Sequence, residues 1–267
     1  MSEQALGRRP SPLRVGDVKE LLAGLLSTSM PVAAKTSFKP KLMQALYGGG
    51  RIRFLSVDLE ALPLRHNEHQ KSADSVLLVA GIQPIMISGL RLEYGKPKQK
   101  MVSLPECDSI DLANWVHTES EGYDALVIFY SNYDHGVLQS YEPLISARYG
   151  RFTPLPSVCV DIMKPFAGQG ISASQAHLSQ FYGIGVEKQS ISLEIWDRVV
   201  VGPFFGMSRP MINRECRRIR DERNAKCLVD NVADLVFIAK NIRYQNKLKI
   251  SLTYPNEQKI AELLGEN

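Results

Sequence analysis

The stretch Ser75–Leu104, SVLLVAGIQPIMISGLRLEYGKPKQKMVSL, is the longest nearly continuous apolar run of the chain. Its β-branched residues favour strands, and Pro84 would remove a backbone donor from a helix and clash with the preceding turn. Charges and glycines interrupt the run before it reaches the roughly 20 apolar residues of a membrane span. The stretch therefore predicts two or three buried strands, with a basic turn at Lys96–Lys100 that leads into a short strand at Met101–Leu104.

Strand and helix patterns continue on both sides of this stretch. Alternation of apolar and polar residues predicts a half-exposed strand at Arg51–Leu64. Further strands are predicted at Tyr123–Tyr130, Val158–Met163, Ser190–Val201 and Lys247–Tyr254. Helical spacing predicts helices at Val18–Leu26, Ile110–His117, Asn213–Asp234 and after Asn256, whereas Tyr141–Pro156 is rich in breakers and predicts irregular structure.

Many strands with few helical patterns between them favour a particular fold class. We expect an α+β fold with a mainly antiparallel, sandwich-like β core and flanking helices. A length of 267 residues suits one large domain. We therefore expect a flexible basic arm at residues 1–14 and a single domain at 15–267, with a sub-boundary near 202–210 as an alternative.

The overall composition is that of a globular protein, with 44% hydrophobic and 22% charged residues. A net charge of +4 is mildly basic and compatible with a polyanionic partner. The cysteines have no close neighbour of their kind, which is typical of free thiols in a reducing compartment. Since no signal-peptide pattern is visible, we expect a cytoplasmic location, with a peripheral position at membranes as an alternative.

No segment carries a specific catalytic signature. The glycines Gly48–Gly50 lack the Lys-Ser/Thr of a phosphate loop, and His66 and His69 are too few for a zinc site. We therefore predict neither a metal nor another cofactor.

Two weaker patterns leave a hydrolase open as a hypothesis. Two-metal nucleases gather several carboxylates, and the candidates here are Asp108, Asp111, Asp124 and Asp134. A thiol–imidazole pair is the other pattern, and its candidates are Cys107 or Cys159 with His117, His135 or His177. Nothing in the spacing requires either set to converge.

Basic residues give a more consistent signal. The segment Arg209–Lys226 predicts a helix rich in arginine, whose forked guanidinium groups suit phosphates. The residues predicted to bind nucleic acid are Arg214, Arg217, Arg218, Arg220 and Arg223, with contributions from Lys96, Lys98 and Lys100. The alternative is a solvated helix with internal ion pairs, because Asp221 can pair with Arg217 or Arg218.

The region Leu77–Asp108 resembles the central region of plant-virus cell-to-cell movement proteins of the thirty-kilodalton superfamily. The matching features are an apolar strand that enters Gly81, a second strand at Ile85–Leu92, the polar turn Lys96–Lys100, and a strand that ends near Asp108. The resemblance implies a β-sandwich-like core, cooperative binding of single-stranded nucleic acid and a location at the membrane periphery. Only Asp108 carries over, as a structural residue, and its Pro-Glu-Cys-Asp context departs from the apolar strand of that family.

Taken together, these patterns predict a non-enzymatic nucleic-acid-binding protein of the movement type. A viral matrix or assembly protein is the first alternative, in which the basic surface meets anionic membrane. Self-association would then use the predicted N-terminal helix through Leu21, Leu22 and Leu25. A hydrolase that uses the Asp or Cys/His groups is the second.

Overall fold

The computed structural model describes residues 48–63, 75–88, 91–162 and 206–232, together with Pro40, Lys41, Gln44, Ala45, Gln175 and Val199. The predicted arm at 1–14, the helix at Val18–Leu26, the strand at Lys247–Tyr254 and the helix after Asn256 lie outside these residues. Of the strand predicted at Ser190–Val201 only Val199 is described, and it is helical rather than extended.

The centre of the fold is one mixed sheet of six strands in the order β3-β2-β1-β5-β6, with β4 paired to β2. The strands are β1 (Ile52–Pro63), β2 (Ser75–Ser88), β3 (Arg91–Tyr94), β4 (Lys98–Met101), β5 (Ala125–Ile128) and β6 (Cys159–Asp161). Strands β1 to β4 pair antiparallel, whereas β5 is parallel to β1 and β6 is parallel to β5. The α+β class is confirmed, but the expectation of a mainly antiparallel, sandwich-like core is wrong.

The sequence patterns locate most of these strands. The apolar run at Ser75–Leu104 forms three of them, β2, β3 and β4. Strand β4 begins at Lys98, so the predicted basic turn is partly strand, and Met101 ends β4 rather than beginning a strand. The strand predicted at Arg51–Leu64 is confirmed as β1, yet it is mostly buried rather than half-exposed because sheet neighbours and helices enclose it.

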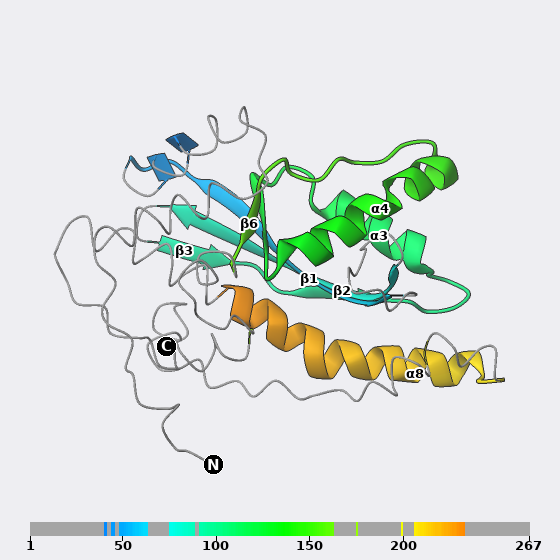
Figure 1. Cartoon of the computed structure of the whole chain (residues 1–267). Helices are drawn as coiled ribbons and strands as arrows, with labels where there is room; N and C mark the ends of the chain where they lie inside the picture. The colour runs from blue at the N-terminus through cyan, green and yellow to red at the C-terminus, as the bar shows by residue number, and fades with distance from the viewer. Residues whose placement is uncertain are drawn as a thin grey trace, which may run out of the picture.

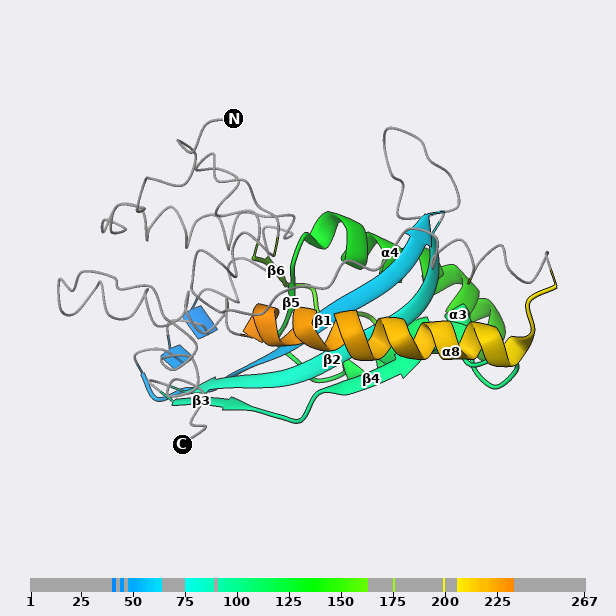
Figure 2. The same ribbon diagram turned by 90° about the horizontal axis from the view of Figure 1, so that it is seen from below.

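Helices cover both faces of this sheet (Figure 1). Helices α3 (Ser109–Glu119) and α4 (Ser131–Tyr149) lie on one face. Helix α8 (Arg209–Ile219) lies on the other and continues through a π turn, η4 (Arg220–Asn224), into helical residues 225–232. Figure 2 shows this long helix lying across β1 and β2. No helix within the described residues is both long and apolar enough to cross a membrane.

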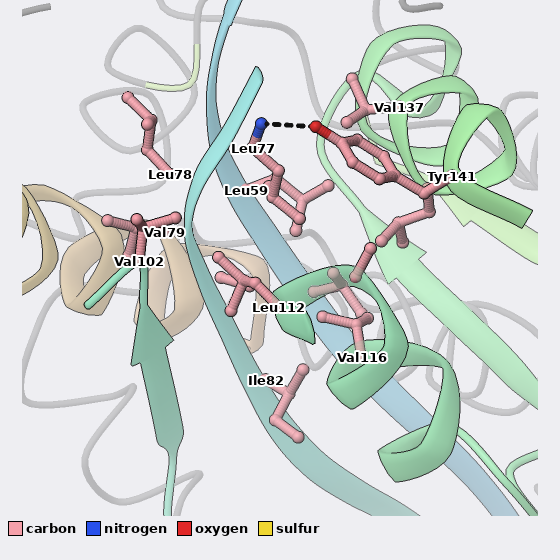
Figure 3. Packing of buried hydrophobic residues seen from close by; sticks show 14 of the residues in the cluster. Leu59, Leu77, Leu78, Val79, Ile82, Val102, Leu112, Val116, Val137 and Tyr141 are labelled. Atoms are coloured by element: carbon pink, nitrogen blue, oxygen red, sulfur yellow. Dashed lines mark hydrogen bonds between the residues drawn. The ribbon is translucent and has the colours of Figure 1, made fainter. Parts of the chain in front are cut away.

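Helix α4 corrects the prediction of irregular structure at Tyr141–Pro156, since it continues to Tyr149 with Pro143 inside it. Its buried residues Val137, Leu138 and Ile145 pack into the core, and this packing outweighs the local cost of the proline. The Tyr141 hydroxyl accepts a hydrogen bond from Leu77 N–H at 3.1 Å and donates one to the Ser75 carbonyl at 3.1 Å. Figure 3 shows Tyr141 reaching the backbone of β2 above Leu59 and Leu112.

The sheet changes from antiparallel to parallel pairing at β1. From β1 the chain turns back into the antiparallel strand β2 on one side, while on the other side β5 leads through α4 to the parallel strand β6. Helices α3 and α4, which precede and follow β5, lie on the same face of the sheet. The opposite face of β1 is covered by the long helix that begins with α8.

Candidate metal centre

Strand β1 carries polar residues in the middle of the sheet. Ser56, Asp58 and Glu60 alternate with apolar residues, so all three point to the same face. Their exposed fractions are only 0%, 8% and 5%. A central strand thus buries two carboxylates two residues apart, an arrangement that is costly unless hydrogen bonds or cations compensate the charge.

The helix that follows α8 supplies those compensating groups. Asn224, which is fully buried, donates its Nδ2 to Asp58 Oδ2 at 2.8 Å and to the Asp58 carbonyl at 2.9 Å. Its own Oδ1 accepts from Gln99 Nε2 at 2.9 Å. Further along the same helix, Asn231 Nδ2 donates to the Val57 carbonyl at 3.2 Å. These contacts fix the helix on β1 and orient the Asp58 carboxylate.

A glycine allows the helix to approach so closely. Gly81 of β2 lies opposite Asp58 of β1, and a Cβ at Gly81 would stand 1.9 Å from Asn224 Oδ1 and 2.6 Å from Leu228 Cδ1. Any larger residue would overlap the helix. The contact between Asn224 and Asp58 thus depends on the absence of a side chain at residue 81.

Three potential metal ligands converge at this contact. One carboxylate oxygen of Asp58, one of Glu60 and the Sγ of Cys227 all lie within 4.8 Å of one another. The exposed fraction of Cys227 is 2%. The guanidinium of Arg223 also reaches the cluster, with its Nε 2.9 Å from Glu60 Oε1. The positively charged side chain of Arg223 therefore already pairs with Glu60, which is one of the three potential ligands.

Two further carboxylates are buried, one on the helix that carries Cys227 and one on α4. Asp230 follows Cys227 by three residues in helical structure, so the two side chains lie on the same side of the helix. Asp134 is buried in the first turn of α4, directly after β5.

The neighbouring Tyr133 contacts β1. Its hydroxyl donates to the Ala61 carbonyl at 3.1 Å. Burial raises the pKa of Tyr133, and the negative charges of Asp134 and Glu60 raise it further. Asp134 itself lies on α4, on the face of the sheet opposite to α8.

The turn between β5 and α4 is held firmly. Tyr130 has a left-handed backbone with φ 62°, which is uncommon for a residue with a side chain. Asp161, at the end of β6, accepts hydrogen bonds from Ser131 N–H at 2.9 Å and Ser131 Oγ at 2.8 Å. This buried carboxylate thereby fixes the start of α4, which carries Asp134.

The predicted arginines do not all share one environment. Arg214, Arg217 and Arg218 are exposed on the outer side of α8, away from the buried Ile212, Cys216 and Ile219. Arg218 pairs with Glu222 at 3.0 Å. Asp221 pairs with Arg220 at 2.7 Å rather than with Arg217 or Arg218, the partners expected from the sequence. Arg223 instead faces the carboxylates of β1.

The predicted lysines lie on another side of the molecule. Gln99 of β4 donates to Arg220 O and to Asn224, so its side chain faces the π turn. Lys98 therefore points to the opposite face, where it pairs with Glu119 of α3 at 2.7 Å, and Lys100 shares that face. Lys96 is exposed in the turn before β4. The lysines of β4 and the arginines of α8 thus lie on opposite faces of the sheet.

The aspartates singled out from the sequence have mainly structural contacts. Asp108 caps α3, accepts from the N–H groups of Ile110 and Asp111, and pairs with Arg148 at 2.7 Å. Asp124 accepts from Arg53 N–H at 2.8 Å and pairs with Lys41. Asp134 is buried in the first turn of α4, and the predicted aspartates therefore do not converge with the cluster on β1.

The predicted thiol–imidazole pairs find no support in the described contacts. The ring nitrogens of His117 contact the Thr153 and Leu138 carbonyls at 2.8 Å and 3.3 Å. Cys107 Sγ donates to the Asp108 carbonyl at 3.7 Å, and burial raises the pKa of its thiol. His66, His69 and His177 lie outside the described residues.

Asp58, Glu60, Asn224 and Cys227 were missed by sequence reasoning. A usable signal was present, because two acids in alternation inside an apolar strand must share a face. The spacing of Asn224, Cys227 and Asn231 likewise places polar side chains along one side of a helix. No family model matches the chain, and no curated protein matches it either.

Proposed function

We propose that this protein is a divalent-cation-dependent hydrolase of phosphodiester bonds in nucleic acid. The observation that carries the proposal is the convergence of three buried residues, Asp58 and Glu60 of β1 and Cys227 of the helix that packs on it. The site lies on β1, where the sheet changes from antiparallel to parallel pairing. Metal-assisted hydrolysis is the reaction class that converging carboxylates serve best.

Each residue of the cluster and its surroundings would have a separate chemical role. Asp58 and Glu60 would hold the cation, and Asn224 keeps the Asp58 carboxylate oriented. A bound divalent cation would lower the pKa of a coordinated water and stabilise charge on a phosphoryl oxygen. Arg223 is placed to bind a substrate phosphate, because its guanidinium already sits at the cluster beside Glu60.

The substrate class follows from the charges on the same helix. Arg214, Arg217 and Arg218 are exposed on α8, which continues directly into the segment that carries Arg223 and Cys227. Guanidinium groups bind phosphates through paired hydrogen bonds and release counterions from a polyanion. These arginines would hold a chain of phosphates on the outer side of the helix, and Arg223 is the guanidinium that reaches the carboxylates of β1.

Cleavage assays with carboxylate variants test this function. We expect the purified protein to cleave labelled single-stranded RNA or DNA with Mg²⁺, Mn²⁺ or Zn²⁺ and to be inactive in EDTA. Asp58→Asn and Glu60→Gln should each lower the cleavage rate by about 100-fold or more, since each removes a ligand charge. Asp221→Asn, which removes an exposed carboxylate of the same helix, is the matched control and should change little.

Two results would overturn the proposal. Cleavage that persists in EDTA would exclude a cation, and cleavage that both variants leave intact would exclude this site. Thermal unfolding of each variant shows whether a loss of rate reflects a loss of folded protein.

A second candidate is the non-enzymatic nucleic-acid-binding protein predicted from the sequence. The exposed arginines of α8 favour it, because they supply phosphate contacts without any chemistry. Retention of RNA without cleavage under every cation tested would support this candidate over the hydrolase. The matrix-type alternative requires binding to anionic vesicles instead, and the movement-protein resemblance stays a prediction.

A further inference from the structure

We infer that Cys227 is a metal ligand and that the site takes a thiophilic divalent cation such as zinc or cobalt. This inference deepens the proposed function, on which it rests for the location of the site, by naming the class of cation. The thiol is the feature that decides it, because sulfur is a poor ligand for Mg²⁺ and a good one for Zn²⁺ and Co²⁺.

The spacing of the three donor atoms suits a single metal ion. Around a tetrahedral zinc, with Zn–S of about 2.3 Å and Zn–O of about 2.0 Å, donor atoms stand roughly 3.3 to 3.5 Å apart. The donors of Asp58, Glu60 and Cys227 already lie within 4.8 Å of one another. Three protein ligands also leave a fourth position for water or substrate, as catalytic zinc sites require.

Buried hydrogen bonds around the three residues hold them in place. Asn224, fully buried, donates to Asp58 Oδ2 at 2.8 Å and is held in turn by Gln99 at 2.9 Å. Hydrogen bonds of this kind orient metal-ligating carboxylates and raise affinity. Cys227 is itself held in place, because its carbonyl accepts from Gln175 Nε2 at 3.3 Å. The ligands are thus positioned by a buried network that reaches three separate segments.

Arg223 lies beside Glu60, with its Nε 2.9 Å from Glu60 Oε1. A divalent ion that takes this oxygen as a ligand has to displace the guanidinium. Binding of the ion would make the guanidinium turn from the ligating oxygen of Glu60 toward solvent or a substrate phosphate. The same side chain would thereby compensate the carboxylate before the ion binds and contact the anion afterwards.

Cobalt titration of the whole chain tests the inference directly. Co²⁺ bound to a thiolate gives an intense charge-transfer absorption in the near ultraviolet, which oxygen ligands do not give. We expect this band in the unsubstituted protein and its loss in Cys227→Ser. Cys107→Ser, which removes another buried thiol outside the cluster, should keep it. Zinc should abolish the band by competition.

A second measurement keeps the test decisive if Cys227→Ser fails to fold. In the unsubstituted protein, alkylation of each cysteine under partially denaturing conditions can be followed by mass spectrometry with and without zinc. We expect zinc to slow modification of Cys227 by at least about tenfold relative to Cys107, because a coordinated thiolate is withdrawn from reaction. Asp58→Asn should remove that protection.

The outcomes separate this inference from the proposed function. If Co²⁺ binds without the charge-transfer band and zinc gives Cys227 no protection, the thiol is not a ligand, while a carboxylate-bound cation can still support cleavage. If Co²⁺ gives the band but nucleic acid is never cleaved, the metal site stands and the hydrolase proposal fails. If no cation binds, both are wrong.

Discussion

At the scale of single residues, Gly81 controls how closely the long helix approaches the sheet. We expect Gly81→Ala to lower the free energy of unfolding by about 1 to 3 kcal/mol, the usual cost of overpacking. The cause is the 1.9 Å separation that the new Cβ would have from Asn224 Oδ1. Chemical denaturation measures the loss, and cobalt titration should show weaker binding because Asn224 is displaced from Asp58.

Gly150→Ala is the matched control for this substitution. Gly150 has φ +72° and no atom near its hypothetical Cβ, so alanine there brings backbone strain without overlap. It should lower stability by about 1 kcal/mol and leave cobalt binding unchanged. Equal cobalt affinity in both variants would contradict the role given to Gly81.

Residue types that carry this site were visible in the sequence, but their burial was not. The alternation at Asp58 and Glu60 was correctly taken as a strand, and solvent was assumed on the polar side. The polar side of β1 is instead covered by the long helix that begins with α8. Asn224 of this helix is 166 positions away from Asp58 along the chain. Local patterns contain no information about a partner at that distance, so the convergence of Asp58, Glu60 and Cys227 could not be predicted from them.

At the scale of elements, the π turn η4 changes which residues of the long helix face the sheet. Buried positions follow α-helical spacing at Ile212, Cys216 and Ile219, and the next fully buried residue, Asn224, comes five positions later. The wider turn adds one residue between the apolar part of the helix and its polar part. Predicting a helix over Asn213–Asp234 was possible from composition, whereas this change of phase was not.

The buried thiol of Cys216 makes the stability of this helix depend on pH. Burial raises the pKa of Cys216 to about 12 from a usual value of 9.0. Between these pH values the unfolded state has lost the thiol proton and the folded state keeps it, so unfolding becomes easier as pH rises. This one group should reduce the free energy of unfolding by about 1.4 kcal/mol per pH unit above pH 9.

Urea denaturation between pH 8 and 10.5 tests this dependence. Cys216→Ala should lose the Cys216 contribution to the pH slope, with a separate pH-independent cost from the removed sulfur. Ile219→Val removes a similar buried volume one turn away without a titrating group, and it should keep the full slope. Identical slopes in the two variants would show that Cys216 does not titrate as described.

Helix α4 shows the opposite relation between sequence and structure. Pro143 and the breakers after it predicted irregular structure, yet helix continues to Tyr149. The hydroxyl of Tyr141 binds backbone groups on both sides of Val76 in β2, an arrangement that only the folded sheet can provide. Tertiary contacts thus outweighed local propensity.

At the scale of the whole molecule, the distribution of basic residues determines how a polyanion would bind. Replacing Arg214, Arg217 and Arg218 by glutamine should weaken binding of single-stranded RNA and flatten its dependence on salt, because fewer counterions are released. Replacing Lys96, Lys98 and Lys100 should have a smaller effect, since the lysines of β4 lie on the opposite face of the sheet.

Binding isotherms at several salt concentrations make this comparison. Arg148→Gln is a further control, because Arg148 pairs with Asp108 and Asp111 at the start of α3. Equal losses from the arginine and lysine variants would indicate a nonspecific response to net charge. Unchanged affinity in the arginine variant would remove α8 from the binding surface.

The strand topology also marks the limit of prediction for the whole fold. An α+β class and most strand positions followed from apolar runs and breakers, but the mixed order of the sheet did not. Pairing of β1 with β5 in parallel requires the intervening chain to cross over the sheet through α3. Since no periodicity distinguishes a parallel neighbour from an antiparallel one in short strands, the sandwich-like expectation was wrong.

The distance along the chain between Asp58 and Asn224 has a consequence during synthesis. Asp58 is synthesised 166 residues before Asn224, the amide that donates to its carboxylate in the folded protein. Until Asn224 has followed, β1 and β2 can pair, but the Asp58 carboxylate lacks this hydrogen bond. The strand therefore forms in an environment different from the one that it has after the helix has docked.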